Sequence, residues 1–174
     1  MNYIYETTAR IIKKYGTRDP LKLLMRLGTV IQESYSFASL KGYCFYANRT
    51  YYVAVNGNLH ENEKRIILAH EAGHIILHKE RLKNSPLKEL RIYDEASLME
   101  YEANLFAADF LISDEDIEVL SESSSFFDIA CKLCVSEDLL GFKIESMKKR
   151  GYKYSSPLIP DSAFLKKTDR RRII

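Results

Sequence analysis

The chain has 174 residues, of which 46% are hydrophobic and 29% charged, with a formal net charge of +2. This composition excludes a wholly disordered protein, and the length suits one domain with its own core. No apolar run is long enough to cross a bilayer, the first residues lack the layout of a signal peptide, and three cysteines do not make a disulfide framework. We therefore expect a cytoplasmic protein with one domain over residues 1–150 and a basic tail over residues 151–174.

Charge is distributed unevenly along the chain. Residues 89–128 contain twelve acidic residues and one basic residue, whereas residues 141–174 contain ten basic and three acidic residues. The two segments can pair with each other, or the imbalance can steer charged partners.

Two helices are expected at the beginning of the chain. The first covers Tyr5–Tyr15, where apolar residues recur at helical spacing, and Gly16 ends it. The second begins after Asp19, an N-cap residue followed by Pro20 at the first helical position, and runs to Gly28. Each helix therefore ends at a glycine, a common helix terminator.

A region of β-type sequence follows in three segments: Thr29–Glu33, Lys41–Ala47 and Tyr51–Asn56. Asn48 and Arg49 can turn the last two segments into a hairpin. The expected fold class is α+β, with a small three-stranded, mostly antiparallel sheet packed on a motif-bearing helix and surrounded by other helices.

That helix is expected from about Glu61 to His78 and carries the pattern HExxH at residues 70–74. His70 and His74 lie one helical turn apart, so their imidazoles share a face and can bind one ion. Glu71 then lies beside the ion and can accept a proton from water, as zinc-dependent hydrolysis requires. Gly73 lowers helix stability, which usually has a packing or active-site reason. The alternative is two hydrogen-bonded histidines on a half-buried helix.

A catalytic zinc needs a third protein ligand, and the helix expected from Glu95 to Ile112 offers three carboxylates: Glu95, Glu100 and Glu102. On a helical projection Glu100 falls with the apolar residues, whereas Glu102 and Asp109 fall on the solvated side. A carboxylate held against the core is costly, so Glu100 is the expected third ligand, with a salt bridge to a basic side chain as the alternative. Asn104, one turn later, is placed to hydrogen-bond a ligand histidine and fix its tautomer.

The other two histidines are expected to support the site. His78 continues the stripe of His70 and His74, but one helix cannot easily wrap three turns around a tetrahedral ion, so His78 is expected in the core or against a ligand. His60 is expected as an exposed or capping residue. The third histidine of the long metzincin motif would stand at Glu80, which argues against that class.

The segments HEAGHIILH and MEYEANLFAADFLI together resemble the ImmA/IrrE family of metallopeptidases, found in phage and mobile-element regulatory modules. Family members also share the opening helices, a Lys-Gly-Tyr strand and a strand that ends in asparagine before the metal helix. The resemblance implies a gluzincin-like fold with a zinc cofactor on three residues and a base beside it: His70, His74, Glu100 and the base Glu71. It also implies an endopeptidase that cleaves a nearby-encoded helix-turn-helix repressor and so derepresses transcription. Where many members have Leu-Leu-Met-Pro, residues 110–114 read Phe-Leu-Ile-Ser-Asp, and a serine or aspartate cap serves equally well.

For the reaction we expect an extended substrate segment to add to an exposed edge of the sheet, with the strand Tyr51–Asn56 as the candidate. Glu71 would pass the proton from water to the leaving amine. A second donor to the oxyanion is expected among four side chains: Tyr46, His60, Tyr93 and Tyr101. The expected partner is a protein substrate, without membrane contact.

A rival interpretation comes from residues 127–150, which read like a helix-turn-helix with a basic end. The would-be recognition helix begins with Glu137 and Asp138, whose charge opposes phosphates, and offers only Lys143 before its end. A helical pair that caps the core is the expected structure. A DNA-binding or protein-binding regulator with a structural or inactive metal site is the alternative function.

Overall fold

The computed structural model describes residues 2–84, 93–121 and 124–153, without the side chains of residues 2 and 93–97. Its elements in chain order are α1 (Asn2–Tyr15), α2 (Pro20–Arg26), β1 (Val30–Ser34), β2 (Gly42–Ala47), β3 (Thr50–Asn56), α3 (Glu61–Leu77), α4 (Lys79–Asn84), α5 (Tyr93–Leu111), α6 (Asp114–Ser121), α7 (Phe126–Leu133) and α8 (Glu137–Lys149). The predicted α+β class is confirmed. Most of the predicted basic tail, from residue 154 onward, lies outside the described residues.

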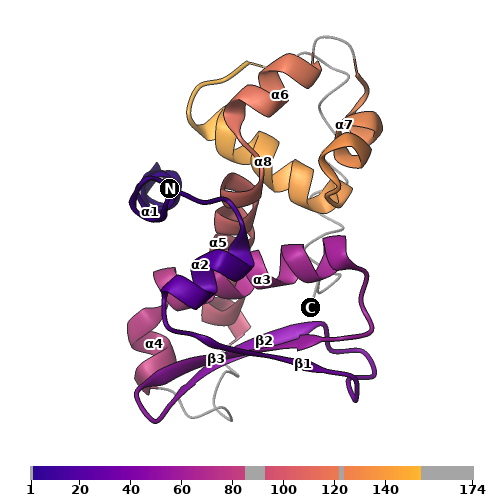
Figure 1. Ribbon diagram of the computed structural model, residues 1–174. Coiled ribbons are helices and arrows are strands. Elements are labelled where there is room, and N and C mark those ends of the chain that lie inside the picture. The colour runs from indigo at the N-terminus through magenta and orange to yellow at the C-terminus, as the bar shows by residue number, and fades with distance from the viewer. Residues whose placement is uncertain (1, 85–92, 122–123, 154–174) are drawn as a thin grey trace.

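The elements form a sheet covered on one side by helices, with a helical group at the far end (Figure 1). The motif-bearing helix α3 contacts α2, α5 and the strands β2 and β3, and α5 also packs against α1 and α8. Helices α6, α7 and α8 gather at the end opposite the sheet (Figure 1). Within the described part of the chain, no helix is long and apolar enough to cross a membrane.

Local signals set the C-terminal end of α1 and both ends of α2 as predicted, whereas α1 begins at Asn2, before the predicted Tyr5. Asp19 is the N-cap of α2, and its side chain accepts hydrogen bonds from two backbone N–H groups of the first turn. Gly16 and Gly28 follow the two helices at φ +59° and φ +72°, a region that favours glycine. The short helix α4 was not expected, because it buries no residue and so has no apolar stripe in the sequence.

The sheet is mixed, with β3 in the middle of the order β1-β3-β2. The hairpin predicted through Asn48 and Arg49 joins β2 and β3 antiparallel, and both turn residues have positive φ, at +49° and +62°. β1 pairs with β3 in parallel, so the prediction of a mostly antiparallel sheet is wrong for that pair. The strand Tyr51–Asn56 is therefore the central strand, and its proposed role as an open edge for a substrate is also wrong.

Asn56 explains how the chain reaches the parallel arrangement. The segment between β1 and β2 must cross the end of β3, and Asn56 is the last residue of β3. Its buried side chain donates hydrogen bonds to the carbonyl oxygens of Phe37 and Leu40 at 3.4 Å and 3.0 Å, and accepts one from the Asn58 N–H at 2.9 Å. One side chain thus ties the crossing segment to the sheet.

Two glycines, Gly73 of α3 and Gly42 of β2, allow α3 to pack closely against α5 and β2. A Cβ added to Gly73 would lie 3.1 Å from the Cα of Ala103 in α5. A Cβ added to Gly42 of β2 would lie 2.5 Å from Ile67 Cγ2 of α3. Of the two reasons expected for Gly73, packing or the active site, the contact with Ala103 supports packing, and the HExxH segment is held between β2 and α5.

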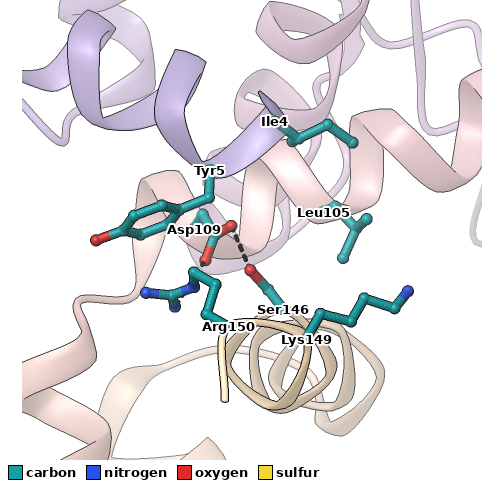
Figure 2. Close-up of a pocket in the computed structure, with 7 residues that line it drawn as sticks. All are labelled: Ile4, Tyr5, Leu105, Asp109, Ser146, Lys149 and Arg150. Atoms are coloured by element: carbon teal, nitrogen blue, oxygen red, sulfur yellow. Dashed lines mark hydrogen bonds and ion pairs between the residues drawn. The ribbon is translucent and has the colours of Figure 1, made fainter. Parts of the chain in front are cut away.

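Helix α8 covers a second face of α5 through buried ion pairs. Lys143 Nζ lies 3.0 Å from Asp109 Oδ1 and 2.6 Å from Asp114 Oδ1, and both Lys143 and Asp109 have side chains only 1% exposed. Arg150 pairs with Asp114 and places its guanidinium 3.7 Å from the ring centre of Tyr5, beside a small pocket between α1, α5 and α8 (Figure 2). The expected attraction between the acidic and basic segments is realised here. The expectation that Asp109 faces solvent is wrong, because α8 covers that side of α5.

Candidate metal centre

Three predicted ligand side chains converge between α3 and α5. The Nε2 atoms of His70 and His74 lie 3.0 Å apart. Glu100 reaches them from α5, with Oε2 3.2 Å from His70 Nε2 and Oε1 3.3 Å from His74 Nε2. This is a group of residues that could hold a metal ion.

Glu100 lies at the rim of this group. Its side chain is 51% exposed, so the expectation that it lies against the core is wrong. Partial burial raises the pKa of Glu100, but hydrogen bonds and charge attraction from His70 and His74 outweigh burial and hold that pKa well below its usual value. The ion-pair partners of Glu100 among the described residues are the two histidines, so the alternative of a salt bridge to a basic side chain stays open in the form of a pair with His70 and His74.

Asn104 fixes the orientation of His70 from outside the group. Its Oδ1 lies 2.8 Å from His70 Nδ1, and this amide oxygen can only accept a hydrogen bond. His70 Nδ1 therefore carries the proton, which leaves the Nε2 lone pair pointing at His74 and Glu100.

A longer chain of side chains fixes His74. His74 Nδ1 lies 3.1 Å from His78 Nδ1, and His78 Nε2 lies 2.9 Å from Glu102 Oε2. Glu102 also accepts a hydrogen bond from the hydroxyl of Tyr3 in α1. Burial lowers the pKa of His78 despite the opposing effect of Glu102, which favours a neutral imidazole. Because neutral His78 donates to a carboxylate through Nε2, its Nδ1 accepts, and His74 must donate through its own Nδ1.

The sequence prediction missed Glu102. The helical projection assigned it to the solvated side of α5, yet its side chain is only 17% exposed. The one signal available in the sequence was its position two residues after Glu100, opposite a histidine stripe that extends to His78.

These outer contacts make the inner group suitable for a cation. When both imidazoles are neutral and carry their protons on Nδ1, as these outer contacts favour, two lone pairs and a carboxylate point at one another without a donor between them, an arrangement that a metal ion would satisfy. A tetrahedral zinc with bonds of about 2.0–2.1 Å would hold neighbouring ligand atoms about 3.3–3.4 Å apart. The observed separations of 3.0, 3.2 and 3.3 Å are close to that spacing. Two nitrogens and one oxygen are also a common ligand set for catalytic zinc.

Glu71 is buried in α3 and faces strand β2. A Cβ at Gly42 would lie 3.8 Å from Glu71 Oε1, so the absence of a side chain there leaves space beside the carboxylate. Burial, followed by the charge of Glu71 and a hydrogen bond to it, raises the pKa of the Cys44 thiol well above its usual value. The sequence prediction did not assign Cys44 to the site. Cys44 and Gly42 are two residues apart on β2, so both lie on the face of the strand that meets α3.

Of the four candidate oxyanion donors, two already make hydrogen bonds elsewhere in the structure. His60 is the N-cap of α3 and accepts from the Asn62 N–H at 3.3 Å, as one of its expected roles. Tyr101 donates to Glu145 at 2.6 Å, on the side of α8. The side chain of Tyr93 lies outside the described residues. Tyr46, whose ring lies 4.8 Å from that of Tyr51, is the candidate left without a competing polar contact in the described structure.

The helix-turn-helix interpretation requires α8 to be an exposed recognition helix, and the structure does not support this. α7 and α8 are indeed separated by a short turn, with Ser136 as the N-cap of α8. Eight residues of α8 are buried, and Lys143, its one early basic residue, is held by two aspartates. A helix used in this way cannot present its side chains to a DNA groove.

The comparisons with known proteins point in the same direction as the geometry. The family model described as the IrrE N-terminal-like domain, a peptidase family, matches residues 25–145. A protein of Bacillus phage phi105, named uncharacterized immunity region protein 2, is 31% identical over 105 residues, which cover 60% of this chain and 65% of that protein. The chain thus matches less than two thirds of the length of this relative.

Proposed function

The chain belongs to the ImmA/IrrE family of peptidases, and from this premise we propose that it is a zinc-dependent endopeptidase whose substrate is a helix-turn-helix repressor of a phage or mobile element. The observation that carries the proposal is the convergence of two histidine lone pairs and a carboxylate beside a buried glutamate. The phage relative, which is named for an immunity region, supports a regulatory substrate.

In this proposal His70, His74 and Glu100 hold the zinc, and Asn104 and His78 orient the two histidines. Zinc supplies Lewis-acid activation of water and of the scissile carbonyl when it is bound. Glu71 accepts the proton of the attacking water on its carboxylate and delivers it to the leaving amide nitrogen. The burial of Glu71 keeps this proton transfer away from bulk water.

The substrate segment would add to the open edge of β2. At one end of the β2–β3 hairpin, the two-residue turn Asn48–Arg49 follows the hydrogen-bonded pair of Ala47 and Thr50. At the other end, Lys41 and Asn56 form a hydrogen-bonded pair, in which the Asn56 N–H donates to the Lys41 carbonyl oxygen at 2.9 Å. Hydrogen-bonded and non-hydrogen-bonded pairs alternate between these ends. The backbone groups that point away from β3 therefore belong to three residues: Gly42, Cys44 and Tyr46.

This edge suits an extended peptide beside the metal centre. No described strand pairs with β2 on its outer side. Two of the three residues with free backbone groups, Gly42 and Cys44, lie next to Glu71 of α3, so a peptide on this edge would run past Glu71. Main-chain hydrogen bonds would provide affinity without requiring a particular side chain.

The experiment that tests the proposal combines metal content with cleavage. The purified chain should bind about one zinc, and His70→Ala should lose it. Incubation with the helix-turn-helix protein encoded beside its gene should yield two fragments. Glu71→Gln should retain zinc and lose cleavage. Absence of zinc binding by the wild type, or full cleavage by Glu71→Gln, would contradict the proposal. A salt-dependent shift of DNA by the chain would support the regulator alternative instead.

A further inference from the structure

Glu102 is the outermost carboxylate of the connected chain that begins at His74. It bonds His78 Nε2 at 2.9 Å with one oxygen and the Tyr3 hydroxyl with the other. We propose that Glu102 is a positioning residue of the metal centre, which acts on His74 through His78 and is itself held by Tyr3 of α1. The inference rests on the proposed metal site but not on the identity of the substrate.

The first step of the argument is the direction of the hydrogen bonds. A carboxylate only accepts, so Glu102 selects the His78 tautomer that carries its proton on Nε2. The bare Nδ1 of His78 then accepts from His74 Nδ1 across 3.1 Å. His74 is thereby left with a free Nε2 lone pair, which is the form that binds a metal.

The second step is burial, which makes the selection matter. His74 and His78 are 8% and 9% exposed, so water cannot easily replace a lost partner. Without Glu102, His78 could carry its proton on Nδ1 and oppose the Nδ1–H of His74. His74 would then rotate or place its proton on Nε2, and either change would remove a ligand from the group.

The third step concerns α1, the source of Tyr3. The family match begins at residue 25, so α1 lies outside the matched segment. Its Tyr3 nevertheless contacts the residue that orients His74. The N-terminal helix of this chain therefore completes the support of the metal centre, in addition to its packing against α5.

The test measures zinc affinity by competition with a chelator, in the full chain and without any substrate. Glu102→Ala should weaken zinc binding by about tenfold to a hundredfold, the usual effect of losing such an outer contact. Glu102→Gln should recover part of this loss, because its amide oxygen still accepts from His78 but carries no charge. Tyr3→Phe should weaken binding less than Glu102→Ala, and should add nothing in the Glu102→Ala background.

A matched control comes from the same helix. Tyr5 of α1 lies 3.5 Å from Asp114 and stacks on Arg150, away from the histidines. Tyr5→Phe should leave zinc affinity unchanged. With cobalt in place of zinc, the visible absorption bands should shift in Glu102→Ala and not in Tyr5→Phe, since only the former alters the geometry of a ligand.

The outcomes separate this inference from the proposed function. If the wild type binds neither zinc nor cobalt, the metal site itself is wrong, and this inference falls with it. If the wild type binds zinc and both Glu102 variants bind it equally well with unchanged cobalt spectra, only the role of Glu102 is overturned. If Tyr3→Phe and Tyr5→Phe change zinc affinity equally, α1 supports the metal centre only by packing and not through the Tyr3 hydrogen bond. Thermal unfolding of the metal-free forms would detect any variant that fails to fold. If Glu102→Ala does not fold, zinc affinity is compared between Glu102→Gln and the wild type.

Discussion

Gly73, in the helix that supplies two histidines, packs directly against the backbone of Ala103, in the helix that supplies Glu100. A Cβ at position 73 would lie 3.1 Å from the Ala103 Cα, 3.2 Å from its carbonyl oxygen and 3.2 Å from Phe106 Cδ1. Two of these three atoms belong to the backbone, so they can yield only if the whole of α5 moves. The separation of the helices, and with it the reach of Glu100 to the histidines, therefore depends on the missing side chain.

Gly73→Ala should thus weaken the metal site although alanine favours helices. The gain in helix propensity is about 1 kcal/mol, whereas overpacking a core costs about 1–3 kcal/mol. We expect a lower free energy of unfolding in the metal-free form and weaker zinc binding, measured by denaturant titration and chelator competition. Adding Ala103→Gly should not restore either property, because the contacts are to backbone atoms. Recovery in that double variant would contradict this account.

Asn104→Ala should reduce zinc affinity by about tenfold to a hundredfold. The 2.8 Å contact of Asn104 Oδ1 with His70 Nδ1 would be lost, and His70 could then place its proton on Nε2. Asn104→Asp keeps an acceptor oxygen at that position and should retain most of the affinity. Chelator competition measures both variants, and equal losses in the two would show that the acceptor is not what matters.

Cys44→Pro tests the use of the β2 edge. Proline removes the Cys44 N–H, which points away from β3, so the sheet can persist while the outer edge loses a donor. We expect a higher KM for repressor cleavage with zinc content unchanged. Cys44→Ala removes the thiol, which hydrogen-bonds Glu71, but keeps the N–H, so it should raise KM less than Cys44→Pro does.

Tyr43→Pro provides the contrast on the same strand. The Tyr43 N–H belongs to a hydrogen-bonded pair with Ala54, so its removal should destabilise the sheet itself. If Cys44→Pro and Tyr43→Pro unfold alike, the assignment of inward and outward backbone groups is wrong.

Asp114 should contribute stability that depends on pH. Burial raises the pKa of Asp114, but hydrogen bonds from Arg150 and Lys143 outweigh it, so the folded-state pKa lies below the ordinary 3.8. A lowered pKa means that the contribution is fully present above that ordinary value and is lost as pH falls through the folded value. Asp114→Asn should lower the free energy of unfolding by about 1.5–3 kcal/mol near neutral pH.

The difference between Asp114→Asn and the wild type should shrink below about pH 4. Urea titrations across pH measure this convergence. Glu115→Gln, an exposed residue of the same helical turn, is the control and should change stability little at any pH. A difference that grows in acid would have the wrong sign for this mechanism.

Much of the local structure could be predicted because its causes are local. Asp19, Gly16 and Gly28 set helix ends through contacts within a few residues, and the Asn48–Arg49 turn set the hairpin. The proposed ligand set could also be chosen from the sequence. The spacing of His70 and His74 indicated two ligands, and the next predicted helix offered few carboxylates for the third.

The errors arose where distant segments decide the outcome. A helical projection of α5 assumes one buried side, but α3, α1 and α8 pack around it. Asp109 is buried by α8 and Glu102 is partly covered near His78 and Tyr3, whereas Glu100 reaches out at the rim. The parallel pairing of β1 could not be predicted either, since it depends on a crossing segment that a buried asparagine ties down.

That crossing segment also implies an order of assembly for the sheet. The β2–β3 hairpin needs only a two-residue turn, and such hairpins form within microseconds. β1 can dock beside β3 only after the chain has looped across the end of the hairpin, at a larger cost in chain entropy. Asn56 closes that loop from the last residue of β3, so its hydrogen bonds form late. The β2 edge proposed to receive the substrate therefore belongs to the hairpin, which forms first. The opposite edge, β1, joins the sheet only when the crossing segment is fixed by the side chain of Asn56.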